Sequence, residues 1–294
     1  MNFYECRKDI RKHLSDNDMR FLENLARATR KYHPEDIHSR IGYEVLGPAL
    51  LGYSSWLHSE AVKAGAEMIV FLSREGNLLK RAYDQLFVED NIKTVYINVS
   101  RISLCRASVL YTKNLDDILH LFTNMINSRK KVREVFEMLG IPEYADEYHA
   151  SDINISEITD RQELYDFIIR KGTAYFYNQN MLLKKYLADK GLTGGSVILS
   201  DIGYAGTMQS LLSNIIPYVR TTGYYVISSD YSRYKHNLMF RQPEIYGYWN
   251  RDKRSWKETA YYFSQMTSFF ETLFLSAEGS TLEYVEHTNR GGGC

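Results

Sequence analysis

The chain is poor in cysteine, proline and long apolar runs. Its three cysteines, Cys6, Cys105 and Cys294, are an odd number and form no CxxC pair, which argues against a disulfide framework or a zinc knuckle. Five prolines among 294 residues are too few for a disordered chain. No window approaches the roughly 18 uncharged apolar residues of a membrane span, and residues 1–14 lack the apolar core of a signal peptide. These absences predict a globular cytoplasmic protein.

Net charge is also absent. Lysine plus arginine and aspartate plus glutamate each number 36, so nothing attracts nucleic acid non-specifically and no nucleic-acid partner is predicted. One local basic run, Arg129-Lys130-Lys131-Val132-Arg133, stands out. Two interpretations of it remain open: a solvated helix face, or a surface that contacts anionic lipid at the inner membrane face, where a lipid-linked substrate would lie.

Several catalytic fingerprints are missing. There is no Walker A sequence and no GxSxG elbow, and only Gly203 and Gly206 have part of the GxGxxG spacing. The single DxD, at residues 16–18, lies in a charged helix-prone stretch and not after a strand. A haloacid-dehalogenase-type phosphatase or a nucleotide-sugar transferase that depends on DxD is therefore not indicated. The histidines show no spacing typical of metal ligands.

Four short apolar runs are typical of buried strands. They span residues 68–72, 94–99, 196–200 and 224–228. Apolar residues at helical spacing follow the first and third runs, and Gly47-Pro48 begins an earlier helix. Since strands alternate with helices, we predict an α/β fold with a mostly parallel sheet and covering helices.

The same patterns divide the chain into three parts. Residues 1–40 are charged and predict a helical amino-terminal extension. Residues 41–285 predict one α/β domain, in which residues 115–190 contain helical patterns but no strand pattern and form a helical insertion. Residues 286–294 end in three glycines and Cys294, and predict a flexible tail.

The turn after the third strand is the stronger candidate for chemistry. Asp201 ends the strand, Gly203 and Gly206 allow tight turns, and Thr207 opens a helix. Free N–H groups at such a turn, with the helix dipole behind them, suit a phosphate group. Asp201 would then hold sugar hydroxyls or a metal. An ordinary β–α turn capped by Asp201 is the alternative.

The turn after the first strand is the second candidate. In Ser73-Arg74-Glu75-Gly76, the guanidinium of Arg74 suits a diphosphate, and Glu75 suits Mg²⁺ or a hydroxyl group. A surface ion pair at a turn is the alternative. Arg101 and Arg106 follow the second strand and would add cations near the same sheet edge, where parallel strands end together. Solvated surface arginines are the alternative.

Aromatic residues concentrate between residues 224 and 284, and Trp249 is among them. Aromatic faces stack on sugar rings, although packing in the core is the commoner role. Glu271 lies in the same stretch, where a carboxylate suits either a helix end or an acceptor hydroxyl.

Residues 198–208 resemble the substrate loop of type I phosphoribosyltransferases. In that loop two acids follow a strand, and a Thr-Gly-x-Thr sequence comes three residues later. Asp201 and Gly206 match the pattern, whereas Ser200, Ala205 and Met208 stand in place of the first acid and the two threonines. The Ser73–Gly76 turn lies where that fold keeps its pyrophosphate loop.

A wider set of segments resembles a region of bacterial polysaccharide-biosynthesis proteins. The set comprises Gly47-Pro48, residues 71–76, Ser100-Arg101 and residues 201–209, and the likeness covers about residues 40 to 285. The resemblance implies transfer of 5-phosphoribosyl from phosphoribosyl diphosphate (PRPP) to a sugar hydroxyl of an O-antigen or capsule, with inversion and release of diphosphate. It also implies Mg²⁺ as cofactor and a haloacid-dehalogenase-type phosphatase, fused or separate, that later removes the 5-phosphate.

The resemblance also assigns roles to residues. Asp201, Glu75 and Arg74 would be catalytic, Glu75 and Asp201 would hold Mg²⁺, and Trp249 and Glu271 would bind the acceptor. The residues implied to bind PRPP are Ser73, Arg74, Gly76, Arg101, Asp201, Gly203, Tyr204, Ala205, Gly206 and Thr207. The base for the acceptor hydroxyl stays open among Glu75, Asp201 and Glu271. Two other functions also stay open: a nucleobase phosphoribosyltransferase of salvage, and a non-catalytic module that senses PRPP.

Overall fold

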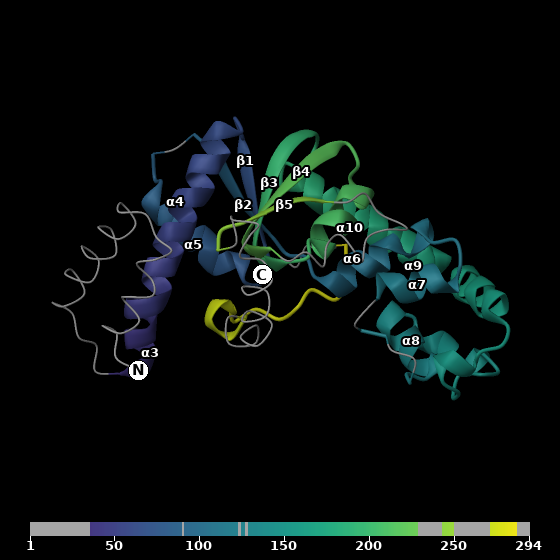
Figure 1. The fold of residues 1–294 in the computed structure, drawn as a ribbon. Helices are drawn as coiled ribbons and strands as arrows, with labels where there is room; N and C mark the ends of the chain where they lie inside the picture. Colours follow the sequence, from purple (N-terminus) through teal and green to yellow (C-terminus); the bar gives the residue numbers. More distant parts are fainter. Residues whose placement is uncertain are drawn as a thin grey trace, which may run out of the picture.

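A five-stranded sheet forms the centre of the computed structural model, which describes residues 36–89, 91–122, 125–126, 129–228, 243–249 and 271–286. Helices lie on both faces of this sheet (Figure 1). Its strands are β1 (Met68–Leu72), β2 (Lys93–Ile97), β3 (Gly195–Tyr204), β4 (Val219–Ser228) and β5 (Glu244–Gly247). All neighbours pair in parallel, in the order β2-β1-β3-β4-β5. The predicted α/β class with a parallel sheet is confirmed.

The strands differ from the predicted ones at their ends. β3 continues beyond Ser200 to Tyr204, so Asp201 lies inside the strand and not after it. β5 was missed altogether. It is short, begins at a glutamate and lies at the sheet edge, where less burial is needed and the apolar signal is weaker.

Alternate residues of the strands pack on opposite faces. On one face Ile69, Phe71 and Ile198 pack against α4 (Gly47–Lys63) and α5 (Gly76–Leu86). On the other face Val70, Leu72, Val197 and Leu199 pack against α6 (Arg101–Ser108), α9 (Arg161–Asp189) and α10 (Thr207–Ile215). This two-face burial is why the strands are almost continuously apolar.

The chain between β2 and β3 is helical, as predicted for residues 115–190. After α6 come η2 (Val109–Tyr111), α7 (Leu115–Leu121), α8 (Val132–Leu139), η3 (Pro142–Glu147), η4 (Ile155–Glu157) and α9. The residues described here contain no strand. Figure 1 shows α7, α8 and much of α9 extending beyond the sheet. Before α4 lie α3 (Ile37–Ile41) and η1 (Gly42–Leu46), and the rest of the predicted extension, residues 1–35, falls outside the described residues, as do residues 287–294 of the predicted tail.

The strand order opens a crevice at one edge. The chain moves from β1 outward to β2, then returns to the other side of β1 with β3. Right-handed connections running in opposite directions cover opposite faces, so α5 lies on one face and α6 to α9 lead to the other. Where the connections diverge, a crevice forms outside the carboxyl ends of β1 and β3, and ligands of open α/β sheets bind there.

Candidate functional site

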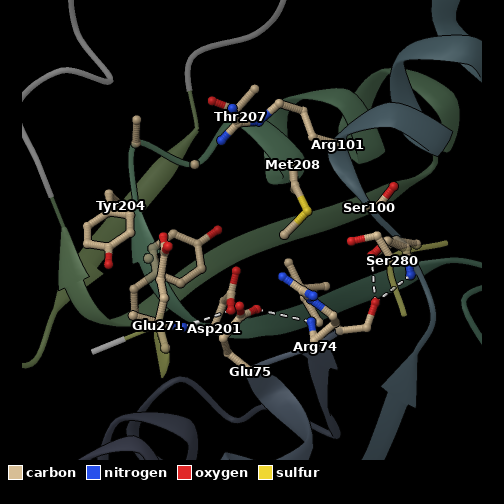
Figure 2. Close-up of a pocket in the computed structure, with 18 of the residues that line it drawn as sticks. Arg74, Glu75, Ser100, Arg101, Asp201, Tyr204, Thr207, Met208, Glu271 and Ser280 are labelled. Atoms are coloured by element: carbon tan, nitrogen blue, oxygen red, sulfur yellow. Dashed lines mark hydrogen bonds between the residues drawn. The ribbon is translucent and has the colours of Figure 1, made fainter. Parts of the chain in front are cut away.

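A cleft of about 460 Å³ occupies this crevice (Figure 2). The described residues that line it come from the turn after β1, the turn after β2, the end of β3 with the start of α10, and residues 271–286, together with Met125 and with Tyr225 of β4. The lining residues that the sequence had singled out for PRPP are Ser73, Arg74, Arg101, Asp201, Gly203, Tyr204, Ala205, Gly206 and Thr207, joined by Glu75 and Glu271. The two candidate turns, about 130 residues apart in sequence, therefore border one cavity.

The turn after β1 is held by Ser73. Its backbone N donates to Ile97 O at 3.0 Å, its hydroxyl donates to Val99 O, and Val99 N donates back to that hydroxyl at 2.9 Å. Ser73 is buried, and its hydroxyl is committed to the protein itself. Its place is therefore to join this turn to the chain after β2, which leaves Arg74 and Glu75 as the side chains that can reach a ligand from this turn.

Gly76 lies under this turn and does not line the cleft. A Cβ atom at Gly76 would lie 3.1 Å from the carbonyl carbon of Phe71, so glycine lets α5 start directly against β1. Its contribution to the site is the close packing of the turn on the strand.

The end of β3 and the turn that follows it each need a glycine. Gly203 has φ = 140°, and a Cβ there would lie 1.9 Å from Ile227 O of the neighbouring strand. Gly206 has φ = 68°, and its Cβ would lie 2.4 Å from Ile245 Cδ1 of β5. Other residues are strained at such φ values, and here they would also collide. Two peptide bonds are cis: Ser73–Arg74 in the turn after β1, and Gly203–Tyr204 at the end of β3.

The amino-terminal end of α10 borders the cleft. Gly206 is the residue before the helix, and Thr207 and Met208 of its first turn line the cavity. The first amides of a helix have no partner within it, and the helix dipole places partial positive charge there. This end of the cleft can thus take an anionic group.

Asp201 and Tyr225 lie side by side on the floor of the cleft, in register on β3 and β4. Ile202 N donates to Asp201 Oδ1 at 2.8 Å. The Tyr225 hydroxyl donates to Gln209 Oε1 at 3.0 Å, and the Gln209 side chain is fully buried. Contacts with α10 and between the strands therefore fix the floor of the cleft. The sequence pattern does not predict this position for Tyr225.

Three carboxyl groups share the cleft. Asp201 is only 5% exposed, and burial raises its pKa well above the usual range; the charges of Glu75 and Glu271 raise it further, against the Ile202 hydrogen bond. The pKa of Glu271, which is exposed at the edge of the cleft, is also raised, first by partial desolvation and then by Glu75, while Arg101 and Arg74 lower it. The site therefore places carboxyl groups, which repel one another when ionised, beside the guanidinium groups of Arg74 and Arg101.

This donor set fits the implied Mg²⁺. The charge of Glu75 raises the pKa of Asp201, and a divalent cation between the two would favour the ionised carboxylate of Asp201. Mg²⁺ is typically held by one or two carboxylates together with substrate phosphates. Within the described ranges, no group of three or more His, Cys, Asp and Glu side chains could hold a metal ion alone. The residues present suit a cation that a phosphorylated ligand helps to bind.

Ser200 faces away from the cleft. Its side chain is fully buried on the α4 face and lies 2.8 Å from the Tyr53 hydroxyl, which donates to Tyr224 O at 2.7 Å. The pleat puts neighbouring strand residues on opposite faces, so Ser200 cannot share the environment of Asp201. A serine at this position thus removes no acid from the cleft floor.

Two other expected residues lie outside the cleft. Trp249 packs beside Tyr248, with ring centroids 6.5 Å apart, against the α4-side core. Arg106 was expected to add a cation at the sheet edge, and it is buried instead. Its guanidinium donates to the carbonyls of Met138 at 2.9 Å, Glu137 at 3.1 Å and Leu282 at 3.1 Å, so it joins α6 to the end of α8 and to the carboxyl-terminal segment.

Residues 271–286, here called the C-terminal strap, form a wall that the sequence did not reveal. In Figure 1 the strap is the yellow segment that runs from below the sheet towards α6. Gln179 of α9 holds Tyr284 through both backbone groups, at 2.8 and 3.0 Å, and the Ser100 hydroxyl donates to Thr281 O. Ser280 and Glu271 of the strap line the cleft. Phe274 of the strap is buried in the α4-side core, and side-chain hydrogen bonds hold Thr281 and Tyr284 further along.

The basic run at residues 129–133 is partly neutralised. Lys130 pairs with Glu134 at 2.8 Å, and Arg133 pairs with Asp146 at 2.6 Å and Asp152 at 3.3 Å. These pairs favour the solvated-surface interpretation of the run over the lipid contact. Among the helices of the described part, none combines the length and the apolar character needed to cross a bilayer.

No protein-family model and no curated protein matches this chain.

Proposed function

We propose that the protein is a PRPP-dependent glycosyltransferase that moves 5-phosphoribosyl to a sugar hydroxyl of a bacterial surface glycan. One observation carries the proposal: the turns after β1 and β3 border the same cleft, with Arg74 in one and the start of α10 at the other. A ligand with anionic groups at both ends suits this arrangement, and PRPP is such a molecule. The cleft volume, about 460 Å³, lies in the usual range for small-molecule sites.

The lining residues divide between the parts of the donor. Arg74 and Arg101 would bind the diphosphate, since guanidinium groups match phosphate oxygens. Backbone amides of residues 203–207, at the positive end of α10, would bind the 5-phosphate. Asp201 on the floor between them would bind the ribose hydroxyls. Mg²⁺, held by Glu75 and Asp201 with the diphosphate, would offset charge on the leaving group.

Transfer would proceed through cleavage of the C1–O bond to diphosphate, with positive charge developing on the ribose. Arg74 and Arg101 are fixed cations beside the negative charge that develops on the departing diphosphate, which lowers the energy of the transition state. The acceptor hydroxyl attacks the face opposite the leaving group, so the anomeric centre inverts. A phosphatase would act afterwards on the 5-phosphate, and the reaction would take place in the cytoplasm, at the inner membrane face if the acceptor is lipid-linked.

The test is turnover with defined substrates. The protein is incubated with PRPP, Mg²⁺ and a panel of alkyl glycosides, and products are analysed by mass spectrometry and a diphosphate assay. We expect one glycoside to gain a phosphoribosyl group with equal release of diphosphate. Transfer to adenine or uracil instead would indicate the nucleobase enzyme. PRPP binding without diphosphate release would indicate the sensing module, and neither binding nor turnover would contradict the proposal.

The position of Ser200 bears on the alternative of a non-catalytic module that senses PRPP. That alternative draws on Ser200, which stands where the resembled substrate loop has its first acid. Because Ser200 packs on Tyr53 behind the sheet, its identity leaves the carboxyl groups of the cleft unchanged. The cleft retains three carboxyl groups and two guanidinium groups, which a catalytic site can use.

A further inference from the structure

We infer that Glu271 is the group that takes the proton from the acceptor hydroxyl; the inference rests on the proposed function. Among the described residues, three carboxyl groups line the cleft, Glu75, Asp201 and Glu271, and the sequence leaves the choice among them open. The structure separates them by exposure, by hydrogen bonding and by the segment that carries each one.

Asp201 lies too deep for this role. It is 5% exposed on the floor of the cleft, and its Oδ1 already accepts a hydrogen bond from Ile202 N. A donor sugar that occupies the cleft would cover it. With PRPP in the cleft, the acceptor must present its hydroxyl group from the solvent side, so Asp201 is left to the ribose.

Glu75 lies on the wrong side. Its Oε2 accepts a hydrogen bond from Arg74 N at 3.1 Å, so the carboxylate folds back on its own turn. That turn carries Arg74, which would bind the leaving diphosphate. In an inverting displacement the nucleophile and the leaving group lie on opposite faces of the sugar, and the base must lie with the nucleophile.

Glu271 meets both requirements. It belongs to the C-terminal strap, a different segment from the two donor-binding turns, and its side chain is exposed at the cleft. Figure 2 shows Glu271 and Arg74 on opposite sides of Asp201. Among the described residues, none forms a hydrogen bond or an ion pair with its carboxylate that would have to break. An incoming hydroxyl group can therefore reach it.

The transfer step moves one proton to Glu271 and the phosphoribosyl group to the acceptor. The acceptor O–H bond breaks, and its proton passes to a carboxylate oxygen of Glu271. The acceptor oxygen forms the new bond to C1 of the ribose, the C1–O bond to diphosphate breaks, and diphosphate leaves with the electron pair. The protonated Glu271 then returns its proton to water, since it faces solvent.

The test compares Glu271→Gln with Glu286→Gln, which removes a carboxylate from the other end of the same strap. Glu286 is exposed and makes one long ion pair, at 4.0 Å, with Lys185. For E271Q we expect PRPP affinity in calorimetry within about threefold of the wild type, but transfer to the best alkyl glycoside slower by about 100-fold or more. E286Q should match the wild type in both measurements.

Two small alcohols, used as acceptors, distinguish the loss of a general base in E271Q from a displacement of the C-terminal strap. Trifluoroethanol is far more acidic than ethanol and needs less help to lose its proton. With these two alcohols as acceptors, E271Q should show a larger ratio of trifluoroethanol to ethanol turnover than the wild type, because transfer then depends on the acidity of the acceptor itself. A strap that has merely shifted would slow both alcohols equally.

The outcomes separate the two proposals. An E271Q variant with transfer within about threefold of the wild type, or with an unchanged ratio for the two alcohols, overturns this inference and leaves the proposed function intact. Loss of PRPP binding in E271Q also overturns it, since Glu271 would then serve the donor. A wild-type protein that neither binds PRPP nor turns it over overturns both.

Discussion

At the residue scale, Asp201 lines the cleft but lowers the stability of the folded protein at neutral pH, because its carboxyl group is buried. The fold buries this carboxyl group, and burial together with Glu75 and Glu271 raises its pKa well above the usual value. The folded protein therefore holds the Asp201 proton more tightly than the unfolded chain does. As pH rises above the unfolded value of about 3.9, the unfolded state gains by ionising and stability is lost.

Asp201→Asn should accordingly stabilise the protein while abolishing transfer. Asparagine keeps the shape and the oxygen that accepts from Ile202 N, without a charge to bury. We expect a gain of about 1 kcal/mol in the free energy of unfolding at pH 7, shrinking towards zero below about pH 4, where the wild-type carboxyl is protonated in both states. Urea denaturation of the metal-free protein at pH 7 and pH 3.5 measures this, with the exposed Asp189→Asn as control. A gain of equal size at both pH values would contradict the assignment.

Gly203 is a second residue whose identity the site requires. Gly203→Ala places a Cβ 1.9 Å from Ile227 O at a φ of 140°. The turn must then move away from β4, and we expect a loss of about 2 kcal/mol or more in stability, together with weaker binding of ribose 5-phosphate. Gly194→Ala is the control, because no atom lies within 4 Å of its added Cβ. Thermal unfolding and calorimetry give the two readings, and a G203A protein that matches G194A would refute the close approach.

At the scale of elements, the C-terminal strap depends on a few side chains of other elements. Arg106 of α6 donates to Leu282 O of the strap and to the carbonyls of Met138 and Glu137 at the end of α8. A buried guanidinium with these three acceptors cannot be replaced without leaving carbonyl oxygens unsatisfied.

Arg106→Met should therefore loosen the strap and lower stability by about 3 kcal/mol. We also expect transfer to fall more than PRPP binding does, since the strap carries Glu271 whereas the proposed donor contacts belong to the other segments that line the cleft. Arg133→Met, which breaks exposed ion pairs on α8, should cost little. Denaturation and hydrogen exchange at residues 280–285 provide the measurements. Equal stability of the two variants would show that Arg106 does not anchor the strap.

At the scale of the molecule, the proposed function assigns two parts of the cleft to different ends of one ligand. Arg74 belongs to the turn after β1, and the amides of residues 203–207 belong to β3 and α10. Because the two sets are separate, ribose 5-phosphate and diphosphate should each bind alone, and PRPP should displace both. At 100 times its Kd, PRPP with Mg²⁺ should raise the free energy of unfolding by about 2.7 kcal/mol.

A substitution at Arg74 should affect the binding of one end of the ligand without affecting the other. Arg74→Met should weaken diphosphate binding about tenfold or more and leave ribose 5-phosphate binding unchanged, since a guanidinium–phosphate contact is lost at one end only. Lys80→Met, in α5 and paired with Asp84 on the surface, is the control for loss of a nearby cation. Calorimetry with each half-ligand decides, and equal weakening of both by R74M would mean that Arg74 does not belong to one end alone.

Much of the fold could be predicted because its signals are local. The runs at residues 68–72 and 196–200 are buried on both faces, so their apolar character identifies them as strands. β5 and the strap could not be predicted. An edge strand carries a weak apolar signal, and most of the strap is irregular chain held by Phe274 in the core and by side-chain hydrogen bonds to Thr281 and Tyr284. Arg106 was placed wrongly for a related reason: a lone arginine after a strand looks the same whether it faces a ligand or three buried carbonyls.

By itself the amino-acid sequence determined the parallel α/β class, the helical segment between β2 and β3, and the two glycine-containing turns, since burial period and turn chemistry are properties of neighbouring residues. Only the tertiary structure decided that the turns border one cleft, that Ser200 lies behind the sheet while Asp201 lies in front, and that the strap brings Glu271 to the site. Those facts depend on strand order, pleat and long-range hydrogen bonds, which join residues far apart in the chain.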